Sequence, residues 1–121
     1  MPRPSRPWFR FYVEAVYDRK LRRPPPATRW LWVVLLSIAR ASPITGFLMV
    51  SERSPVTTED LADIAALKRS EVEAGMAYFD REGMIEMDPN LGAYCVTSFL
   101  ERQFESDDVT SRTRKHRSKE Q

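Results

Sequence analysis

Apolar side chains recur with helical spacing in the first third of the chain. From Trp8 to Tyr17 they repeat every three or four residues, which predicts an aromatic helix face that fades over residues 18–23. A second helix is predicted from Pro26 to Ala41, because proline is tolerated at the first helical position and Pro43 prevents continuation. This helix is apolar nearly all round, so we expect it at the centre of the core.

The rest of the pattern predicts shorter elements. In order they are a strand over 46–51, a helix over 59–66 with Thr57 or Thr58 as N-cap, a helix over 69–82, and strands over 84–87 and 93–97 around a turn at 88–92. The predicted core stripes of the two helices are Leu61, Ile64, Ala65 and Val72, Met76, Phe79. Gly83 is predicted to end the later helix.

The order of these elements indicates an architecture. Two short helices joined by a brief turn form a helix-turn-helix, and the hairpin that follows takes the place of a wing. We therefore predict a mostly helical α+β domain, a winged helix-turn-helix with an extra N-terminal helix, over residues 8–104. A basic Pro-rich arm (1–7) and a charged basic tail (105–121) flank it. The alternative is a generic small α+β domain.

The net charge of +2 conceals an uneven distribution. Residues 1–29 hold eight Lys/Arg against two Asp/Glu, residues 30–110 hold six against fourteen, and residues 111–121 hold five against one. Basic ends of this kind indicate contact with a polyanion. A basic end of one copy could also contact the acidic middle of the next, which would build multimers, or the tail could cover its own domain.

Composition excludes several classes of function. One cysteine and one histidine exclude a disulfide within the chain and a Cys-rich or multi-His metal centre. The four glycines are isolated, and no nucleophile has a partner base in sequence, so we predict no catalysis and no cofactor. The apolar run from Trp30 to Ala39 is too short for a bilayer, which needs about 20 residues. The N-terminus has no apolar signal stretch, which favours an intracellular protein.

Several segments together resemble the N-terminal domain of phage replisome organisers, which is similar to the N-terminal winged domain of the DnaD primosome proteins. They are residues 8–12, 18–24 and 29–32 at the start, 57–67 and 72–79 in the middle, and 82–85, 102–107 and the basic stretch 112–119. The resemblance implies a phage or prophage protein that binds origin DNA as a multimer and acts with host replication proteins in the bacterial cytoplasm.

The chain departs from this family pattern in two ways. Such proteins often carry a further C-terminal region, whereas the sequence ends at Gln121. The resemblance therefore does not imply recruitment of a loader. The helix-turn-helix turn often has glycine and a capping residue where this chain has Ala66 and Lys68. Ser70 and Glu73 have the spacing of a capping box and are expected to cap the next helix instead.

The predicted helix over 69–82 is the candidate recognition helix. Arg69 can donate hydrogen bonds to guanine, Ser70 can either donate or accept one, and Glu73 can accept one from cytosine N4. Lys68 is suited to a phosphate, and Arg81 lies on the same outer face. The helix is also acidic, with four Asp/Glu against three Lys/Arg over 68–82, which favours a packing or protein-facing role instead.

The basic clusters are the stronger candidates for DNA contact. They comprise Arg19, Lys20, Arg22 and Arg23 before the proline run, and Arg112, Arg114, Lys115, Arg117 and Lys119 in the tail. Five engaged tail cations would contribute about −4 to −5 to the log–log salt slope of binding. The alternative for the tail is a solvated, solubilising segment. A winged protein-interaction module, or a transcriptional regulator, that presents its acidic face to a protein partner is the alternative function.

Aromatic residues near the N-terminus offer one further possibility. Trp8, Phe9, Tyr12, Trp30 and Trp32 could stack on unpaired bases. Their helical spacing beside an apolar run favours core packing, which is our prediction for them.

Overall fold

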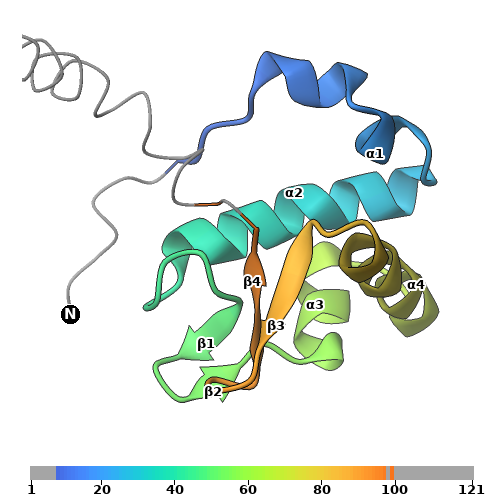
Figure 1. Ribbon diagram of the computed structural model, residues 1–121. Helices are drawn as coiled ribbons and strands as arrows, with labels where there is room; N and C mark the ends of the chain where they lie inside the picture. The colour runs from blue at the N-terminus through green and yellow to red at the C-terminus, as the bar shows by residue number, and fades with distance from the viewer. Residues whose placement is uncertain (1–7, 98, 100–121) are drawn as a thin grey trace, which may run out of the picture.

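A computed structural model describes residues 8–97 and residue 99 of the chain. Helix α2 (Pro26–Ala41) runs across the molecule (Figure 1). On one side of it lie a 3-10 helix, η1 (Val13–Tyr17), and the short helix α1 (Arg19–Arg22); on the other lie α3 (Thr58–Ala65), α4 (Arg69–Arg81) and four strands. The predicted arm 1–7 and tail 105–121 lie outside the described residues.

The predicted central helix is confirmed. Pro26 occupies the first turn of α2, and Ser42 is its C-cap directly before Pro43. Leu31, Leu35 and Ala39 are fully buried, with no exposed surface. They pack among apolar side chains from α3, α4 and the β3–β4 hairpin on the far side of α2, namely Leu61 and Ala65, Val72 and Phe79, and Ile85 and Val96.

The predicted helix over 8–17 is wrong. Residues 8–12 are not helical, and only Val13–Tyr17 form a 3-10 helix, which has no side-chain cap at Tyr12. Asp18 then adopts an extended backbone, and its carboxylate accepts the Lys20 N–H at 2.8 Å. The cap starts a separate helix, α1, where the sequence predicted the helix to fade.

Core packing of the aromatic residues holds only in part. Trp32 packs on Phe79 with 5.0 Å between ring centroids, and Phe9 packs on the core cluster. Trp8 is 47% exposed because it lies in the non-helical segment, and Trp30 is 49% exposed. The Trp30 indole N–H reaches the Ala65 carbonyl at 2.9 Å, which keeps its ring at the rim of the α2–α3 contact.

Helix α3 begins with the predicted cap. The Thr57 hydroxyl accepts the Asp60 N–H at 3.1 Å, and the Asp60 carboxylate accepts the Thr57 N–H at 3.0 Å, which completes a capping box. Leu61 and Ala65 are buried as expected, but Ile64 is 56% exposed. That part of the predicted stripe is wrong, because α3 buries only the narrow face that meets α2 and α4.

The turn from α3 to α4 forms without glycine. Ala66 takes the left-handed conformation, with φ at 57°, and the Leu67 N–H returns to the Ala62 carbonyl at 3.0 Å. The expected Ser70–Glu73 cap of α4 is wrong. The carboxylate of Glu71 instead accepts the Lys68 N–H at 2.9 Å, because α4 begins one residue before Ser70.

Two small antiparallel sheets close the structure. Strands β3 (Ile85–Asp88) and β4 (Ala93–Val96) form the predicted hairpin. The predicted strand over 46–51 is shorter, β1 (Met49–Ser51), and pairs with β2 (Ser54–Pro55), which the sequence pattern did not indicate. The chain before β1 joins β4 through the Leu48 N–H to the Tyr94 carbonyl at 2.9 Å.

The described residues thus form an α+β fold whose helices and small sheets are compatible with a winged-helix arrangement. Within the same residues, no helix is both long enough and apolar enough to cross a membrane.

Candidate nucleic-acid interface

Four basic residues lie in α1 or directly after it. Three of them lie within the helix, Arg19, Lys20 and Arg22, and Arg23 is its C-cap. All four are exposed, and the Arg23 guanidinium lies 3.8 Å from the Glu82 carboxylate. A helix of four residues is unstable alone, because ordering the first turn costs more free energy than the hydrogen bonds of that turn contribute. Contacts with the rest of the fold must therefore hold it.

Tyr78 of α4 provides such a contact. Its hydroxyl donates a hydrogen bond to the Lys20 carbonyl at 2.8 Å, which joins α1 to α4 across 58 positions in sequence. The Arg81 guanidinium lies 5.6 Å from the centre of the Tyr78 ring. Tyr78 thus brings Arg81 to the same surface as the α1 cations. Tyr78 is not among the site residues that the sequence predicts, because its only signal there is a polar-tipped aromatic beside Phe79, which is buried.

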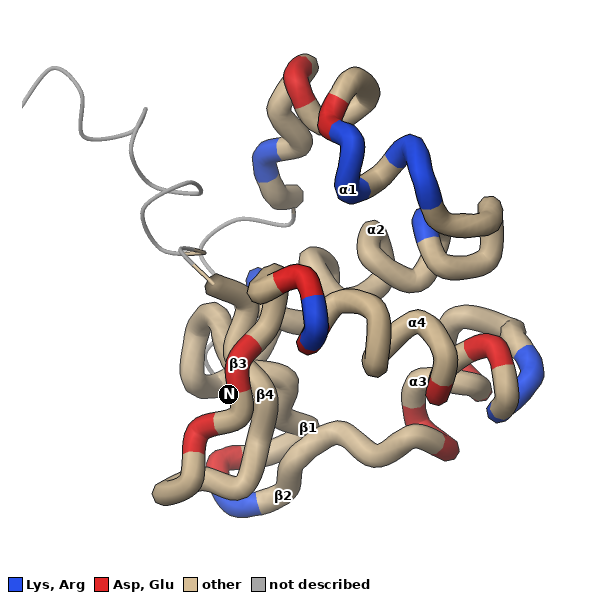
Figure 2. Tube along the Cα trace, turned by 45° about the vertical axis from the view of Figure 1, so that its right-hand side comes forward, with Lys and Arg blue, Asp and Glu red and all other residues tan. Residues whose placement is uncertain are grey.

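Charge is divided between the two sides of α2. Residues 8–29 hold six Lys/Arg against two Asp/Glu, whereas residues 46–97 hold four against ten. Figure 2 shows the basic positions concentrated along α1 and the acidic positions spread over α3, α4 and β3. In the described part of the chain, the surface best suited to a polyanion is therefore the α1 side.

The candidate recognition helix presents the face that the sequence predicted. Ser70, Glu73 and Arg81 of α4 are exposed, and so is Lys68 before it. Arg69, however, forms ion pairs with Glu59 of α3 and with Glu73 at 3.1 Å. The hydrogen bond that the Arg69 guanidinium donates to Glu73, and then the attraction of Glu59, raise the pKa of Arg69 above its ordinary value. Arg69 would have to leave two carboxylates to reach a guanine.

The predicted site residues therefore fall into three groups. Arg19, Lys20, Arg22, Arg23 and Arg81 share one surface, while Lys68, Arg69, Ser70 and Glu73 lie at the other end of α4. The tail residues Arg112, Arg114, Lys115, Arg117 and Lys119 lie outside the described residues. Among the residues that the structure describes, no group of three or more His, Cys, Asp or Glu side chains could hold a metal ion.

Comparison with known proteins identifies the family. A family model described as the N-terminal phage replisome organiser matches residues 18–121. No curated protein and no solved structure matches the chain. The matched region begins at the Asp18 cap of α1 and includes the basic cluster, α2, α3, α4 and both sheets. The chain belongs to the N-terminal phage replisome organiser family, which indicates a role in phage replication.

Proposed function

We propose that this protein binds duplex DNA at a phage origin through the α1 cations, as a winged helix-turn-helix protein without catalytic activity. The observation that carries the proposal is the set of four cations over residues 19–23, held against α4 by the hydrogen bond between Tyr78 and Lys20. Cations fixed on a rigid surface release counterions from DNA when they meet its phosphates.

The winged helix-turn-helix assignment rests on local geometry. Helix α3 ends in a short turn at Ala66, α4 follows at once, and the hairpin β3–β4 comes directly after α4. In this arrangement the second helix of the pair enters the major groove and the hairpin lies beside it. The acidic residues around Arg69 favour a minor role for α4 in reading bases, so phosphate contacts from α1 and from the tail dominate affinity.

A salt titration of duplex binding tests the α1 surface. Full-length protein should bind with an affinity that falls steeply with salt, and each of Arg19→Gln, Lys20→Gln and Arg22→Gln should reduce the log–log slope by about 0.9. Arg53→Gln, in the exposed turn between β1 and β2 on the acidic side, is the matched control and should leave the slope unchanged. Equal effects of all four variants would contradict the assignment.

The substitution Tyr78→Phe separates position from charge. It keeps the net charge and the ring but removes the hydroxyl that holds the Lys20 carbonyl. We expect weaker duplex binding with a smaller salt slope, because α1 loses its fixed place. Thermal unfolding of the same variant shows whether the domain remains folded; a folded variant with the parent's affinity would refute a positioning role for Tyr78.

Self-association, the tail and replication partners belong to the same proposal. A basic α1 side and an acidic α3 side suit contacts between copies on the same duplex, and the family supports DNA or replication proteins as partners. Removal of residues 111–121 should lower the salt slope by about 4 to 5 if all five tail cations engage phosphates. Sedimentation with and without duplex would detect multimers, and a single monomeric species in both would contradict them.

The acidic side supports one alternative function. Ten Asp/Glu against four Lys/Arg over residues 46–97 would suit a protein partner in place of DNA. Absent or salt-independent duplex binding by the full chain and by the truncated chain would favour that alternative. A measured turnover of nucleotide or DNA that is abolished by one acidic substitution would overturn the absence of catalysis.

A further inference from the structure

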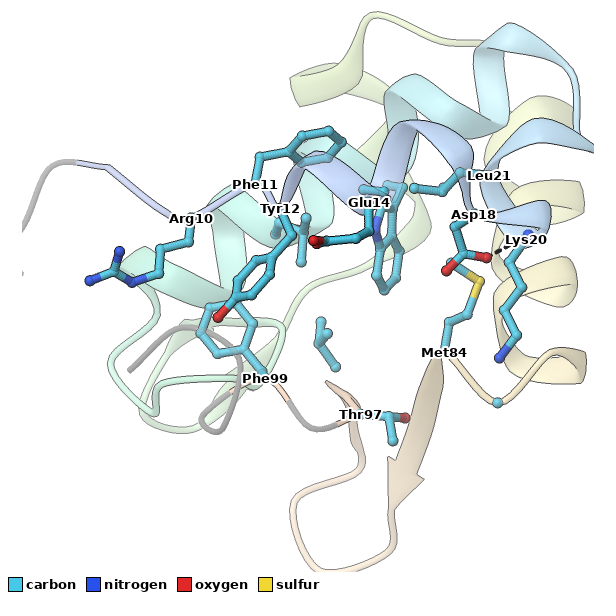
Figure 3. Close-up of a pocket in the computed structure, with 15 residues that line it drawn as sticks. Arg10, Phe11, Tyr12, Glu14, Asp18, Lys20, Leu21, Met84, Thr97 and Phe99 are labelled. Atoms are coloured by element: carbon cyan, nitrogen blue, oxygen red, sulfur yellow. Dashed lines mark hydrogen bonds between the residues drawn. The ribbon is translucent and has the colours of Figure 1, made fainter. Parts of the chain in front are cut away.

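A cavity lies beneath the N-terminal segment, on the α1 side of the molecule. Its volume is about 300 Å³, at the lower end of the range for small-molecule sites, roughly 300–1,000 Å³. Residues from segment 10–21 form one wall, and α2 contributes Trp32 and Leu36. The rest comes from residues 83–84 before β3 and from Val96, Thr97 and Phe99 at and after the end of β4. Figure 3 shows Arg10 and Lys20 at opposite ends of the labelled lining residues, with Tyr12 and Glu14 between them.

The lining combines aromatic and apolar residues with four charged ones, Arg10, Glu14, Asp18 and Lys20. Four of the lining residues are aromatic: Phe11, Tyr12, Trp32 and Phe99. Phe99 is buried and Phe11 is 44% exposed, which places one aromatic in the interior and one at the opening. A planar, aromatic ring is the shape that such walls accept best.

Two further aromatic side chains of the N-terminal segment, Trp8 and Tyr17, are exposed and lie outside the cavity lining. Trp8 is 47% exposed and Tyr17 72% exposed, although both were expected to pack in a helix face. The Arg10 guanidinium lies 5.1 Å from the centre of the Trp8 ring. Exposed aromatic rings that alternate with cations are the arrangement that binds single-stranded nucleic acid, because bases stack on the rings while cations follow the phosphates.

We propose that this surface binds single-stranded DNA, with one unpaired base in the cavity beside Phe11 and a neighbouring base on Trp8. The phosphates run toward the cations of α1, of which Lys20 also lines the cavity. The Glu14 and Asp18 carboxylates line the same cavity and accept hydrogen bonds from exocyclic amino groups, as acidic side chains do from cytosine N4. The site therefore favours cytosine or adenine over thymine.

This site goes beyond the duplex contact proposed above, although the two share the α1 cations. A duplex cannot use it, because paired bases are stacked inside the helix and present only their edges. The same surface would then hold either one strand of an opened duplex by its bases or unopened duplex by its phosphates.

Binding to single-stranded oligo-dC tests the proposal. A strand of about 12 nucleotides is used, because this length lies within the range of single-strand site sizes. The probe is compared with an abasic strand of equal length, using the full chain and fluorescence anisotropy. We expect tighter binding to oligo-dC than to the abasic strand. Phe11→Leu and Trp8→Leu should each weaken oligo-dC binding by about 5- to 150-fold, the usual effect of losing one stacking ring. Equal affinity for the two strands would overturn the proposal.

The matched control is Trp30→Leu. Trp30 is exposed to the same degree as Trp8, but its indole bonds to α3 on the other side of α2. The variant Trp30→Leu should bind oligo-dC with unchanged affinity. A loss of affinity as large as that of Phe11→Leu would refute the location of the site. Duplex binding measured in parallel should be unaffected by Phe11→Leu, so failure of the duplex proposal and failure of this one give different results. Thermal unfolding of each variant verifies its fold.

Discussion

Replacing Gly75 with alanine tests how closely α4 packs on α2. A Cβ at Gly75 would lie 2.7 Å from the Cδ2 atom of Leu31 and 3.7 Å from the Thr28 side chain. Leu31 has no exposed surface, so its side chain cannot turn into solvent to make room. Overpacking of this kind typically costs about 1–3 kcal/mol. Alanine in place of glycine within a helix gains about 1 kcal/mol. The net effect is a loss of about 0–2 kcal/mol in the free energy of unfolding.

The double variant with Leu31→Val separates these two contributions. Valine has no Cδ2 atom, so the collision disappears, and Gly75→Ala should then stabilise the protein by about 1 kcal/mol through helix propensity. Leu31→Val alone should cost roughly 1 kcal/mol for the buried methylene that it removes. The coupling energy between the two positions is therefore expected at about 1–3 kcal/mol, within the range for residues in contact.

Urea unfolding of the parent, both single variants and the double variant measures this coupling. Ala77→Gly, at an exposed position of the same helix, is the control; it should cost about 1 kcal/mol in either Leu31 background. Additive effects of Gly75→Ala and Leu31→Val, within about 0.3–0.5 kcal/mol, would refute the reasoning. The two positions would then not compete for the same space.

Three further predictions concern single residues. Thr57→Ala removes the hydroxyl that accepts the Asp60 N–H, so unfolding free energy should fall by about 1 kcal/mol; an unchanged urea midpoint would contradict the cap. Ala66→Gly relieves a left-handed backbone that costs a non-glycine residue roughly 1–2 kcal/mol, so the melting temperature should rise, and a fall would show that the strain is absent. The Cys95 pKa lies above its ordinary value, first because partial burial desolvates the thiolate and then because Glu86 repels it. Iodoacetamide should therefore need a higher pH to alkylate the native thiol than the urea-unfolded one, with Glu86→Gln narrowing the difference; identical pH profiles would exclude this cause.

The sequence predicted those elements whose ends are determined by local chemistry. Proline determines both ends of α2, the Thr57 box determines the start of α3, and Gly83 ends α4 with a positive φ of 74°. The prediction of a helix over 8–17 failed because apolar spacing alone matched a helix, whereas residues 8–12 are not helical and the extended backbone of Asp18 separates η1 from α1.

The candidate interface was predictable as a list of cations but not as a surface. Tyr78 and Lys20 lie far apart in sequence, so no local pattern could indicate their hydrogen bond. The same holds for Glu59, which reaches Arg69 from a different helix. Periodicity shows which face of α4 is outward, but it does not show which partners from other elements already hold the side chains on that face.

The unequal charge on the two sides of α2 makes the described domain an electric dipole. Near a polyanion, such a dipole experiences a torque before any contact forms, and it turns its α1 side inward within about 10 Å at moderate ionic strength. The opposite side, rich in carboxylates, then faces away and repels a second polyanion. A single copy would therefore engage one nucleic acid at a time, and joining two would require a pair of copies or another segment of the chain.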